Sequence, residues 1–522
     1  MRSKILWAGV CVLLGLSGPV AWAQGSSTTL EDRLAALERR VELLEKENDR
    51  LKAQLSRLSD NAAPQLASLA VASLKPSIAS VGPPLGPEPL PERGASPVPS
   101  PGPSQQPPTA KAQAPSQTAP EAKPERIQVG GQIRFRAEVR QNGDLNSQLS
   151  DLRDFIGQRI RSHVRGKLSD TVETYVEVQD SRLWGQETSP TANDRLTDLH
   201  QGYLQVSDFL RRGLTLRAGR QELAYGSERL VGALDWDNVG RSFDAVKMRY
   251  SSQSWWSDAF AAKVIDRRST ARGERDQYLY GLFNQFFSHR PRHLEVYGFL
   301  FRDGLRSPGE IASRGRKATE IMTLGFRSDK NVEPGVSYEL EFAGQFGHRG
   351  FDSHRAHALA AKAYKTVESK HQLRLGFEYD MASGDRDPAD GHSGEFLNLF
   401  PTNHKYYGYA DLMGWRNMQD FRPMFTVAAG PQMKFDIDYH RLYLLAARGP
   451  WKDAGGNVLG FDPAGQSGTH VGDELDFTVW FPIHKYVKIQ SGYSLFVPGE
   501  FVRHTRGTDR QSFLYLQTLV DL

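Results

Sequence analysis

The sequence predicts an all-β protein, an antiparallel transmembrane β-barrel of about 18 strands (16–20), preceded by an N-terminal coiled-coil helix and a disordered proline-rich linker. Three observations predict this class. Apolar and polar residues alternate with a period of two from Arg126 to the end of the chain. No run of about 18 to 20 apolar residues is present, which excludes a helical membrane protein. Only 39% of the 522 residues are hydrophobic, and a barrel needs apolar residues only at alternate strand positions.

Residues 1–23 are typical of a secretory signal peptide. Two basic residues precede the apolar run from Ile5 to Leu16, and the pattern Ala21-Trp22-Ala23 predicts cleavage after residue 23. The only cysteine of the chain, Cys11, lies in this segment. The mature chain is therefore expected to have no disulfide, no cysteine-bound zinc and no cysteine nucleophile.

Residues 24–58 are expected to form a coiled-coil helix. Leucine recurs at every seventh position from Leu30 to Leu58, and the second seam position contains Asn48. Four heptads with an asparagine in the seam favour a parallel coiled coil, because the buried amide fixes the register. We expect a homo-oligomer of two or three chains; an amphipathic helix on the protein's own surface is the alternative.

Residues 59–125 have the composition of a disordered linker. Of the 29 prolines in the chain, 16 fall in these 67 residues, with Ala, Ser and Gln between them. Such a segment forms polyproline II and coil, and it cannot bury a core.

Residues 126–522 are expected to form the barrel. Residues 336–342, for example, alternate Val, Tyr, Leu and Phe with Ser and Glu. A soluble β-sandwich also alternates, but here charged and amide side chains recur on the polar face with little Ser or Thr. The alternating segments begin near residues 127, 155, 172, 199, 214, 243, 256, 278, 294, 321, 336, 357, 373, 424, 434, 474, 487 and 512.

Two further features favour a barrel in a membrane. The chain ends inside an alternating segment, from Leu514 to Leu522, which suits a last strand that pairs with the first. Aromatic residues near strand ends predict an interfacial girdle on the lipid-facing side. These aromatic residues are Trp255, Trp256, Tyr278, Phe299, Phe301, Phe496 and Phe501.

Two long stretches resemble the signatures of the alginate export porin family. Residues 219–249 read GRQELAYGSERLVGALDWDNVGRSFDAVKMR, and residues 382–412 read ASGDRDPADGHSGEFLNLFPTNHKYYGYADL. The resemblance extends over about residues 127–522. It implies an 18-stranded outer-membrane barrel through which an anionic uronate polymer passes, in agreement with the separate strand count. The N-terminal helix and linker are not part of the family's pattern.

A pore for a polyuronate needs a series of weak cationic contacts, because conduction requires both entry and release. Arginine suits this role, since its planar fork matches a carboxylate in two hydrogen bonds. Acidic residues dominate the lumen side of the later strands, so pairing across the wall is the alternative for any single arginine. The basic residues that we expect along the substrate path are Arg134, Arg136, Arg159, Arg161, Arg217, Arg220, Arg229, Arg241, Lys247, Arg249 and Arg374.

The connection at residues 222–244 is rich in alternating charge, which suggests a loop folded into the lumen as a constriction, plug or gate. A solvated external loop is the alternative. The aromatic run from Phe400 to Tyr407 suits either stacking on sugar rings or packing of its own loop. The acidic candidates for the constriction loop are Glu222, Glu228, Asp235, Asp237 and Asp244.

Enzymatic and nucleic-acid functions find no support in the sequence. Motifs for serine hydrolases, zinc proteases and nucleotide-binding loops are absent from suitable contexts. Asp385, Asp387 and Asp390 faintly resemble a calcium loop but lack its terminal Glu. Basic residues interleave with acidic ones and form no nucleic-acid patch. We expect no enzyme activity, no catalytic residue, no cofactor and no metal.

The expected function is an outer-membrane channel for export or diffusion of an anionic polysaccharide, alginate-like polyuronate, through an arginine-rich lumen. The N-terminal region would lie in the periplasm, and outer-membrane lipid would surround the barrel. One alternative is a general or anion-selective porin for small solutes. Another is a structural protein whose coiled coil tethers the envelope.

Overall fold

The computed structural model describes residues 126–146, 151–187, 197–265, 276–287, 292–304, 318–332, 334–367, 372–430 and 433–522. The predicted signal peptide, coiled-coil helix and linker lie outside these described residues. Within the described part of the chain, no helix has the length and apolar character needed to cross a membrane.

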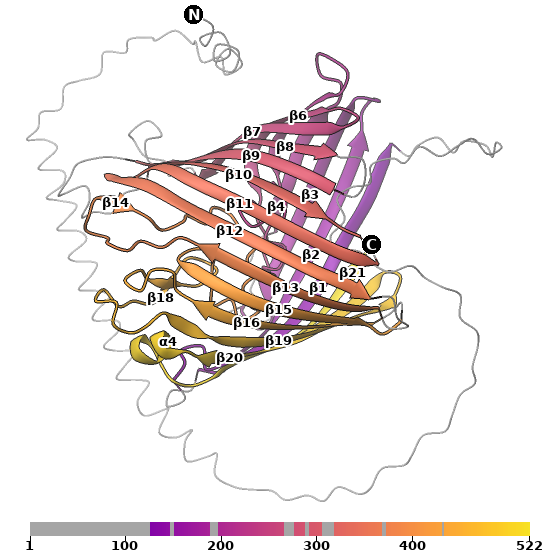
Figure 1. The fold of residues 1–522 in the computed structure, drawn as a ribbon. Coiled ribbons are helices and arrows are strands. Elements are labelled where there is room, and N and C mark those ends of the chain that lie inside the picture. The colour runs from indigo at the N-terminus through magenta and orange to yellow at the C-terminus, as the bar shows by residue number, and fades with distance from the viewer. Residues whose placement is uncertain are drawn as a thin grey trace, which may run out of the picture. The chain divides into compact units, whose positions relative to one another are not determined.

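Eighteen long strands form the wall of the barrel, and Figure 1 shows them side by side around one lumen. They are β1 (Ile127–Gln141), β2 (Arg153–Lys167), β3 (Val172–Leu183), β4 (Asp198–Val206), β5 (Leu214–Gln221), β6 (Phe243–Ser251), β7 (Trp255–Ile265), β8 (Gln277–Phe287), β9 (Arg292–Asp303), β10 (Thr319–Lys330), β11 (Gly335–Arg349), β12 (Asp352–Val367), β13 (Leu373–Ala382), β15 (Met418–Ala428), β16 (Lys434–Tyr443), β19 (His470–His484), β20 (Val487–Pro498) and β21 (Gln511–Asp521).

Each of these strands pairs antiparallel with the next along the chain, and the last pairs with the first. Ile133 of β1 lies opposite Ile160 of β2 on one side and opposite Val520 of β21 on the other. The sheet is therefore closed and has no free edge, so every strand finds its hydrogen-bond partners within the barrel. The predicted all-β barrel of about 18 strands is confirmed.

Most strands begin within two residues of the predicted positions, but three begin earlier. β12, β15 and β19 start at residues 352, 418 and 470, not near 357, 424 and 474. In β12 the first residues, Asp352-Ser353-His354-Arg355, are polar on both faces, and in β15 and β19 the first residues mix polar and apolar types without a clear alternation. The alternation that marks a lipid-facing strand is absent where the strand extends past the apolar belt, so the sequence pattern misses these residues.

The two ends of the barrel differ in the length of their connections. At one end short turns join the strands, such as residues 252–254 between β6 and β7. Both ends of the wall-forming chain lie there, because the Leu522 amide donates to the Gly131 carbonyl. The other end has the long connections 222–242, 383–417 and 444–469, which we call the first, second and third loops. The second loop contains β14 (His392–Ser393), the third contains β17 (Trp451–Lys452) and β18 (Val458–Gly460), and α4 (Glu500–Thr505) joins β20 to β21.

The outer face of the barrel is apolar and exposed, as shown by Val246 and Leu282, each with 50% of its surface accessible. The predicted aromatic girdle is wrong for several members. Phe299, Phe301 and Phe496 are buried on the lumen side, because alternation places them on the same face as the polar Glu295 of β9 or Ser494 of β20. Phe299 packs near Tyr225 of the first loop and Phe301 packs on Phe400 of the second, so apolar contact is available there without lipid.

Candidate functional site

The first loop folds into the barrel and is tied to the inner face of the wall, both close to its own strands and further round the barrel. The Tyr225 hydroxyl donates to Asp258 of β7 at 3.0 Å, and the Ser227 hydroxyl donates to Glu341 of β11 at 2.5 Å. The Tyr225 ring also stacks on Phe283 of β8 with a centroid distance of 4.8 Å. These contacts place the segment inside the lumen, as a loop that narrows the pore.

Arg229 anchors the middle of the first loop. Its guanidinium pairs with Glu378 and lies 3.3 Å from Asp380, both on β13. The side chain is 1% exposed and its carboxylate partners are fully buried. Tyr406 lies under the guanidinium at 3.7 Å from the ring centroid, and the Tyr407 hydroxyl accepts a hydrogen bond. A buried ion pair of this kind is costly to break, because loss of one partner leaves an uncompensated charge.

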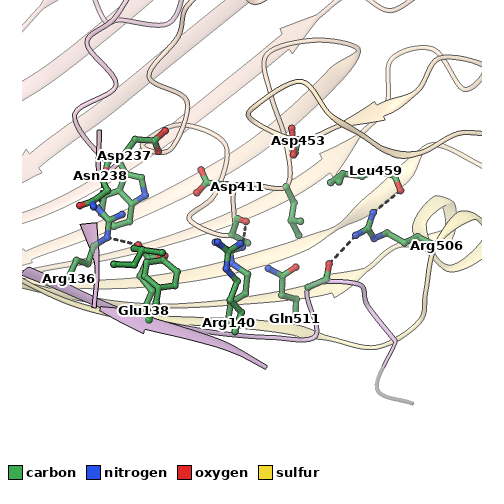
Figure 2. A pocket seen from close by; sticks show the side chains of 17 residues that line it. Arg136, Glu138, Arg140, Asp237, Asn238, Asp411, Asp453, Leu459, Arg506 and Gln511 are labelled. Atoms are coloured by element: carbon green, nitrogen blue, oxygen red, sulfur yellow. Dashed lines mark hydrogen bonds and ion pairs between the residues drawn. The ribbon is translucent and has the colours of Figure 1, made fainter. Parts of the chain in front are cut away.

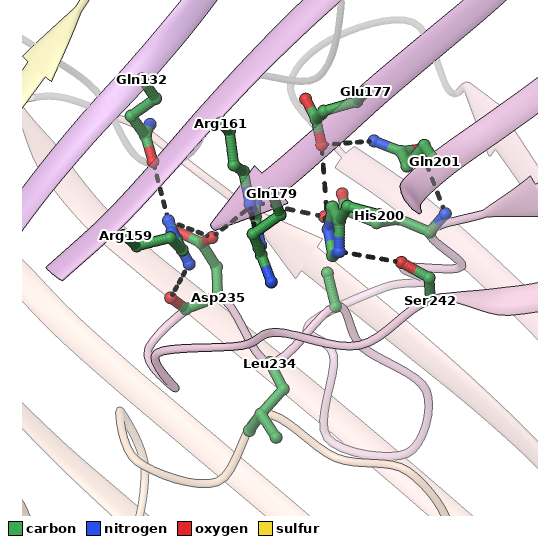
Figure 3. Close-up of polar contacts among 12 residues, drawn as sticks. Gln132, Arg159, Arg161, Glu177, Gln179, His200, Gln201, Leu234, Asp235 and Ser242 are labelled. Atoms are coloured by element: carbon green, nitrogen blue, oxygen red, sulfur yellow. Dashed lines mark hydrogen bonds and ion pairs between the residues drawn. The ribbon is translucent and has the colours of Figure 1, made fainter. Parts of the chain in front are cut away.

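Four arginines on β1 and β2 hold the other end of the first loop, and Figure 3 shows two of them, Arg159 and Arg161, beside Asp235. We call Arg134, Arg136, Arg159 and Arg161 the arginine row, and residues 235–239 of the first loop the latch segment. The row donates mainly to backbone carbonyls of this segment: Arg134 to those of residues 235 and 237 at 2.6 and 2.7 Å, and Arg136 to that of residue 236 at 2.6 Å. Arg159 and Arg161 also reach the Asp235 carboxylate at 2.8 and 3.2 Å.

The second loop packs on the first inside the barrel. The Gly232 amide donates to the Phe400 carbonyl at 2.8 Å. The Thr402 hydroxyl donates to Glu228 at 2.8 Å, and the Trp236 indole stacks on His404 with a centroid distance of 3.6 Å. The two stretches that carry the family resemblance therefore form one interlocked unit.

The wall beneath the second loop is acidic. Glu474 and Asp476 of β19 accept hydrogen bonds from the amides of Ala410 and Tyr409, at 2.7 and 3.2 Å. The third loop covers the second from the other side, because the Trp451 indole donates to a second-loop carbonyl, that of residue 412, at 2.7 Å. The three loops thus pack on one another inside the barrel at the end with the long connections.

A cavity of about 400 Å³ remains between the wall strands β1 and β2 and the loops, beside Arg136 of the arginine row (Figure 2). Arg136 and Arg140 line it from β1, and Trp236 and Asp237 line it from the latch segment. The Arg140 guanidinium donates to the carbonyl of Ala410 at 2.5 Å. The cavity is therefore lined by charges of both signs, and the first loop bounds it on one side.

A second cavity, of about 210 Å³, is basic. Arg217 of β5 and Lys247 and Arg249 of β6 line it, together with Gln205 and Thr215. Asp258 forms a two-point contact with Arg249, at 2.6 and 2.8 Å, and lies 3.8 Å from Lys247. Arg217 donates to the Gln205 amide oxygen at 3.0 and 2.6 Å. Three cations thus converge on one cavity, with one carboxylate in direct contact with two of them.

The remaining predicted residues have varied positions. Arg220 and Asp244 form a pair at 3.4 Å on the outer face of the wall, because their neighbours Gln221 and Phe243 point inward and are buried. For these two residues a lumen position is wrong. Arg374 of β13 lies over the Tyr364 ring at 4.4 Å from its centroid.

Arg241 and Glu222 lie where the first loop meets its neighbours. Arg241 donates to the carbonyl of Gly232 at 2.9 Å and also to that of Phe400, so it joins the two loops. Burial lowers the pKa of Arg241 to about 10, which leaves it charged at neutral pH. Glu222 accepts from His200 of β4 at 2.8 Å and lies 3.5 Å from Arg161.

Several important contacts involve residues that the sequence reasoning did not select. Ser227 and Tyr225 anchor the first loop, but their spacing carries no signal of a long-range partner. Asn238 donates to the backbone carbonyls of Gln158 and Arg182 at 3.1 and 3.2 Å, which ties the latch segment to β2 and β3. The aromatic run of the second loop did indicate packing in the sequence: Tyr406 and Tyr407 are buried and pack within the loops.

No group of three or more His, Cys, Asp or Glu side chains suited to a metal ion occurs among the described residues. In the loop that faintly resembles a calcium site, Asp385 and Asp387 accept from backbone amides two residues further on, at 3.2 Å. These contacts are the ordinary turn chemistry of aspartate.

The closed barrel with an apolar outer face, a charged lumen and inward loops defines an outer-membrane channel protein. Residues 125–515 match the model of the alginate export family, and the chain belongs to that family. Its fold and family are those of channels, not enzymes. No curated protein matches the chain.

Solved structures of Pseudomonas aeruginosa porins are similar to this chain at low identity. OccD3 (OpdP) has a TM-score of 0.49 at 11% identity, covering 76% of this chain and 91% of that one. OccK8 (OprE) has a TM-score of 0.49 at 12% identity, covering 76% and 98%. The outer-membrane protein OprD has a TM-score of 0.48 at 10% identity, covering 76% and 94%.

Proposed function

We propose that the protein conducts an anionic polysaccharide of the polyuronate type across the outer membrane, with lumen cations as successive contacts for its carboxylates. The observation that carries this proposal is the basic cavity of Arg217, Lys247 and Arg249, in which three cations face one carboxylate. A carboxylate of the substrate would supply the missing negative charge. Membership of the alginate export family supports the same substrate class.

We further infer that the N-terminal region lies in the periplasm. The barrel begins at Ile127, at the end with the short turns, and short turns face the periplasm in bacterial outer-membrane barrels. The predicted coiled coil would then associate copies of the chain on that side, at the end of a long linker.

A test compares two arginines of the same strand. Arg217→Gln removes a cation from the basic cavity, whereas Arg220→Gln removes one from the outer face. In planar bilayers we expect Arg217→Gln to lower the anion-to-cation permeability ratio and to weaken block by oligouronates, by about tenfold for one lost charged contact. Arg220→Gln should leave both unchanged. Equal currents and equal block in the two variants would contradict the proposal.

The second candidate function is a porin for small anions. The size of the basic cavity, about 210 Å³, favours it because one small anionic group fills such a space. The two functions differ in their dependence on chain length. Block that strengthens as the oligouronate lengthens supports the polysaccharide, since each added sugar brings a further carboxylate. If a monouronate blocks the current as strongly as a long chain does, the result supports a porin for small anions.

A further inference from the structure

One tryptophan of the lumen wall is exposed. Trp480 of β19 has 38% of its surface accessible. Alternation along the strand places it on the same face as Asp476 and Thr478, and Asp476 accepts a hydrogen bond from the second loop inside the barrel. The strand ends at His484, beside the short turns. The indole therefore faces the open lumen at that end of the barrel and not the lipid.

Two other rings near this end of the lumen are covered by cations. Trp256 of β7 has Arg249 at 4.1 Å from its ring centroid, and Tyr364 of β12 has Arg374 at 4.4 Å. Within the part of the chain that the structure describes, no ring or cation lies on Trp480, and its indole N–H donates to no protein group. Apolar surface exposed to water is unfavourable, so this ring is available to an apolar partner.

Polar groups flank the Trp480 ring. Lys434 of β16 lies opposite Trp480 in the register of the sheet, and Lys488 lies on the lumen face of the neighbouring β20. Lys434 pairs with Asp436 at 2.9 Å, and Lys488 pairs with Asp521 at 3.0 Å. Both lysine side chains are more than two-fifths exposed, at 48% and 43%. Exposed pairs of this kind contribute little stability, so both ammonium groups can exchange partners.

A uronate sugar matches this arrangement of groups. Its pyranose ring has an apolar face of C–H groups, which suits the flat indole, and a polar rim of hydroxyls with one carboxylate. Tryptophan offers a large apolar surface with one N–H donor at its edge. A hydrogen bond from an ammonium group to a carboxylate is roughly twice as strong as a bond between neutral groups. A small inorganic anion would use the lysines but would leave the indole uncovered.

We propose that Trp480 is a stacking platform for one pyranose ring of the polyuronate at the short-turn end of the lumen, with Lys434 and Lys488 as contacts for the carboxylate of that sugar. This inference rests on the proposed function, because it takes a polyuronate as the substrate. It adds a contact that recognises the sugar ring and not its charge. The platform lies on β16, β19 and β20, whereas the basic cavity lies on β5 and β6. The two sites therefore use different parts of the wall.

Two variants at one position test the inference. Trp480→Ala removes the ring, whereas Trp480→Phe keeps an aromatic face in the same place. The readout is the block of single-channel chloride current in planar bilayers by an oligouronate added on the side of the short turns. The concentration for half-maximal block should rise about tenfold in Trp480→Ala and less than about threefold in Trp480→Phe, because the phenylalanine ring still stacks on the sugar.

The chloride current provides the control in each variant. The indole carries no charge, so the anion-to-cation permeability ratio should be equal in Trp480→Ala and in the unchanged protein. A changed ratio would mean that Trp480 shapes the lumen as a whole and would overturn the inference. Equal block of these two proteins would also overturn it and leave the proposed function intact. If no oligouronate blocks the unchanged protein, the proposed function itself is overturned.

A second pair of variants tests the lysine contacts. Lys434→Gln should raise the half-blocking concentration of the oligouronate about fivefold, the effect of one lost contact to its carboxylate. Lys485→Gln is the matched control, because Lys485 belongs to the turn after β19 and lies over Tyr486 at 4.4 Å from the ring centroid. It removes the same charge at the same end of the barrel and should leave the block unchanged. Equal effects of the two variants would overturn the assignment of Lys434 to the platform.

Discussion

The first loop is held at two places that use opposite electrostatics. At β13 one loop arginine, Arg229, enters a wall of carboxylates and meets Glu378 and Asp380. At β1 and β2 four wall arginines meet a loop that offers mostly neutral carbonyls. At the first anchor the loop brings a cation to buried carboxylates, whereas at the second the loop brings mainly backbone carbonyls and one carboxylate, that of Asp235, to the arginines. The two attachments are therefore expected to differ in strength.

The largest effect is expected at the first anchor. Arg229→Gln takes from the buried Asp380 the cation that lies 3.3 Å from it, whereas Glu378 keeps Arg422 at 3.1 Å. Breaking a buried pair in this way costs about 3–5 kcal/mol. The loop should detach from β13. The Gly232 amide bonds to the second loop. The free energy of opening measured by hydrogen exchange at this amide should fall by the same amount. Unchanged exchange at this amide would mean that the ion pair does not anchor the loop.

A smaller effect is expected at the arginine row. Arg159→Gln removes bonds to the latch segment but also relieves repulsion among neighbouring arginines. The attachment of the loop to β1 and β2 should therefore be weakened by only about 1 kcal/mol. Exchange of the Arg241 amide, bonded to the Ala233 carbonyl near the segment, provides the measurement. A loss as large as that of Arg229→Gln would remove the distinction between the two anchors.

The smallest effect is expected outside the lumen. Arg220→Gln breaks a half-exposed pair with Asp244, and such pairs contribute about 0–1 kcal/mol. Neither the exchange of the loop amides nor the midpoint of thermal unfolding should change measurably. A change in loop exchange in this variant would show that a substitution on the outer face alters the loop through the wall. The exchange measured for Arg229→Gln and Arg159→Gln would then have to be compared with that of Arg220→Gln rather than with the unchanged protein.

The parts of the fold that depend on local pattern were predictable. The strand count and most strand starts follow from period-two alternation, because a wall between lipid and water gives every strand one apolar and one polar face. Alternation also placed Arg134 and Arg159 in the lumen. The assignment of Arg220 to the lumen was wrong because alternation was not applied to it: this residue lies one position before the inward Gln221 and three positions after Arg217, so it lies on the outward face.

The aromatic residues could not be placed correctly from the sequence pattern alone. Phe299 and Phe301 have the apolar character of lipid-facing residues, and sequence alone gives no reason for an apolar lumen. The structure supplies that reason, since Tyr225 stacks among the rings of Phe260, Phe283 and Phe299. Their apolar environment is a loop from a distant part of the chain.

By itself the sequence determined the class of protein, the closed wall of about 18 strands and a lumen rich in charge, because each depends on the side-chain period of a strand. It also marked the two stretches that carry the family signature. Only the tertiary structure decided that these stretches interlock inside the barrel and which arginines they occupy. Contacts such as Arg229 with Glu378, separated by 149 residues, depend on loop paths that no local periodicity encodes.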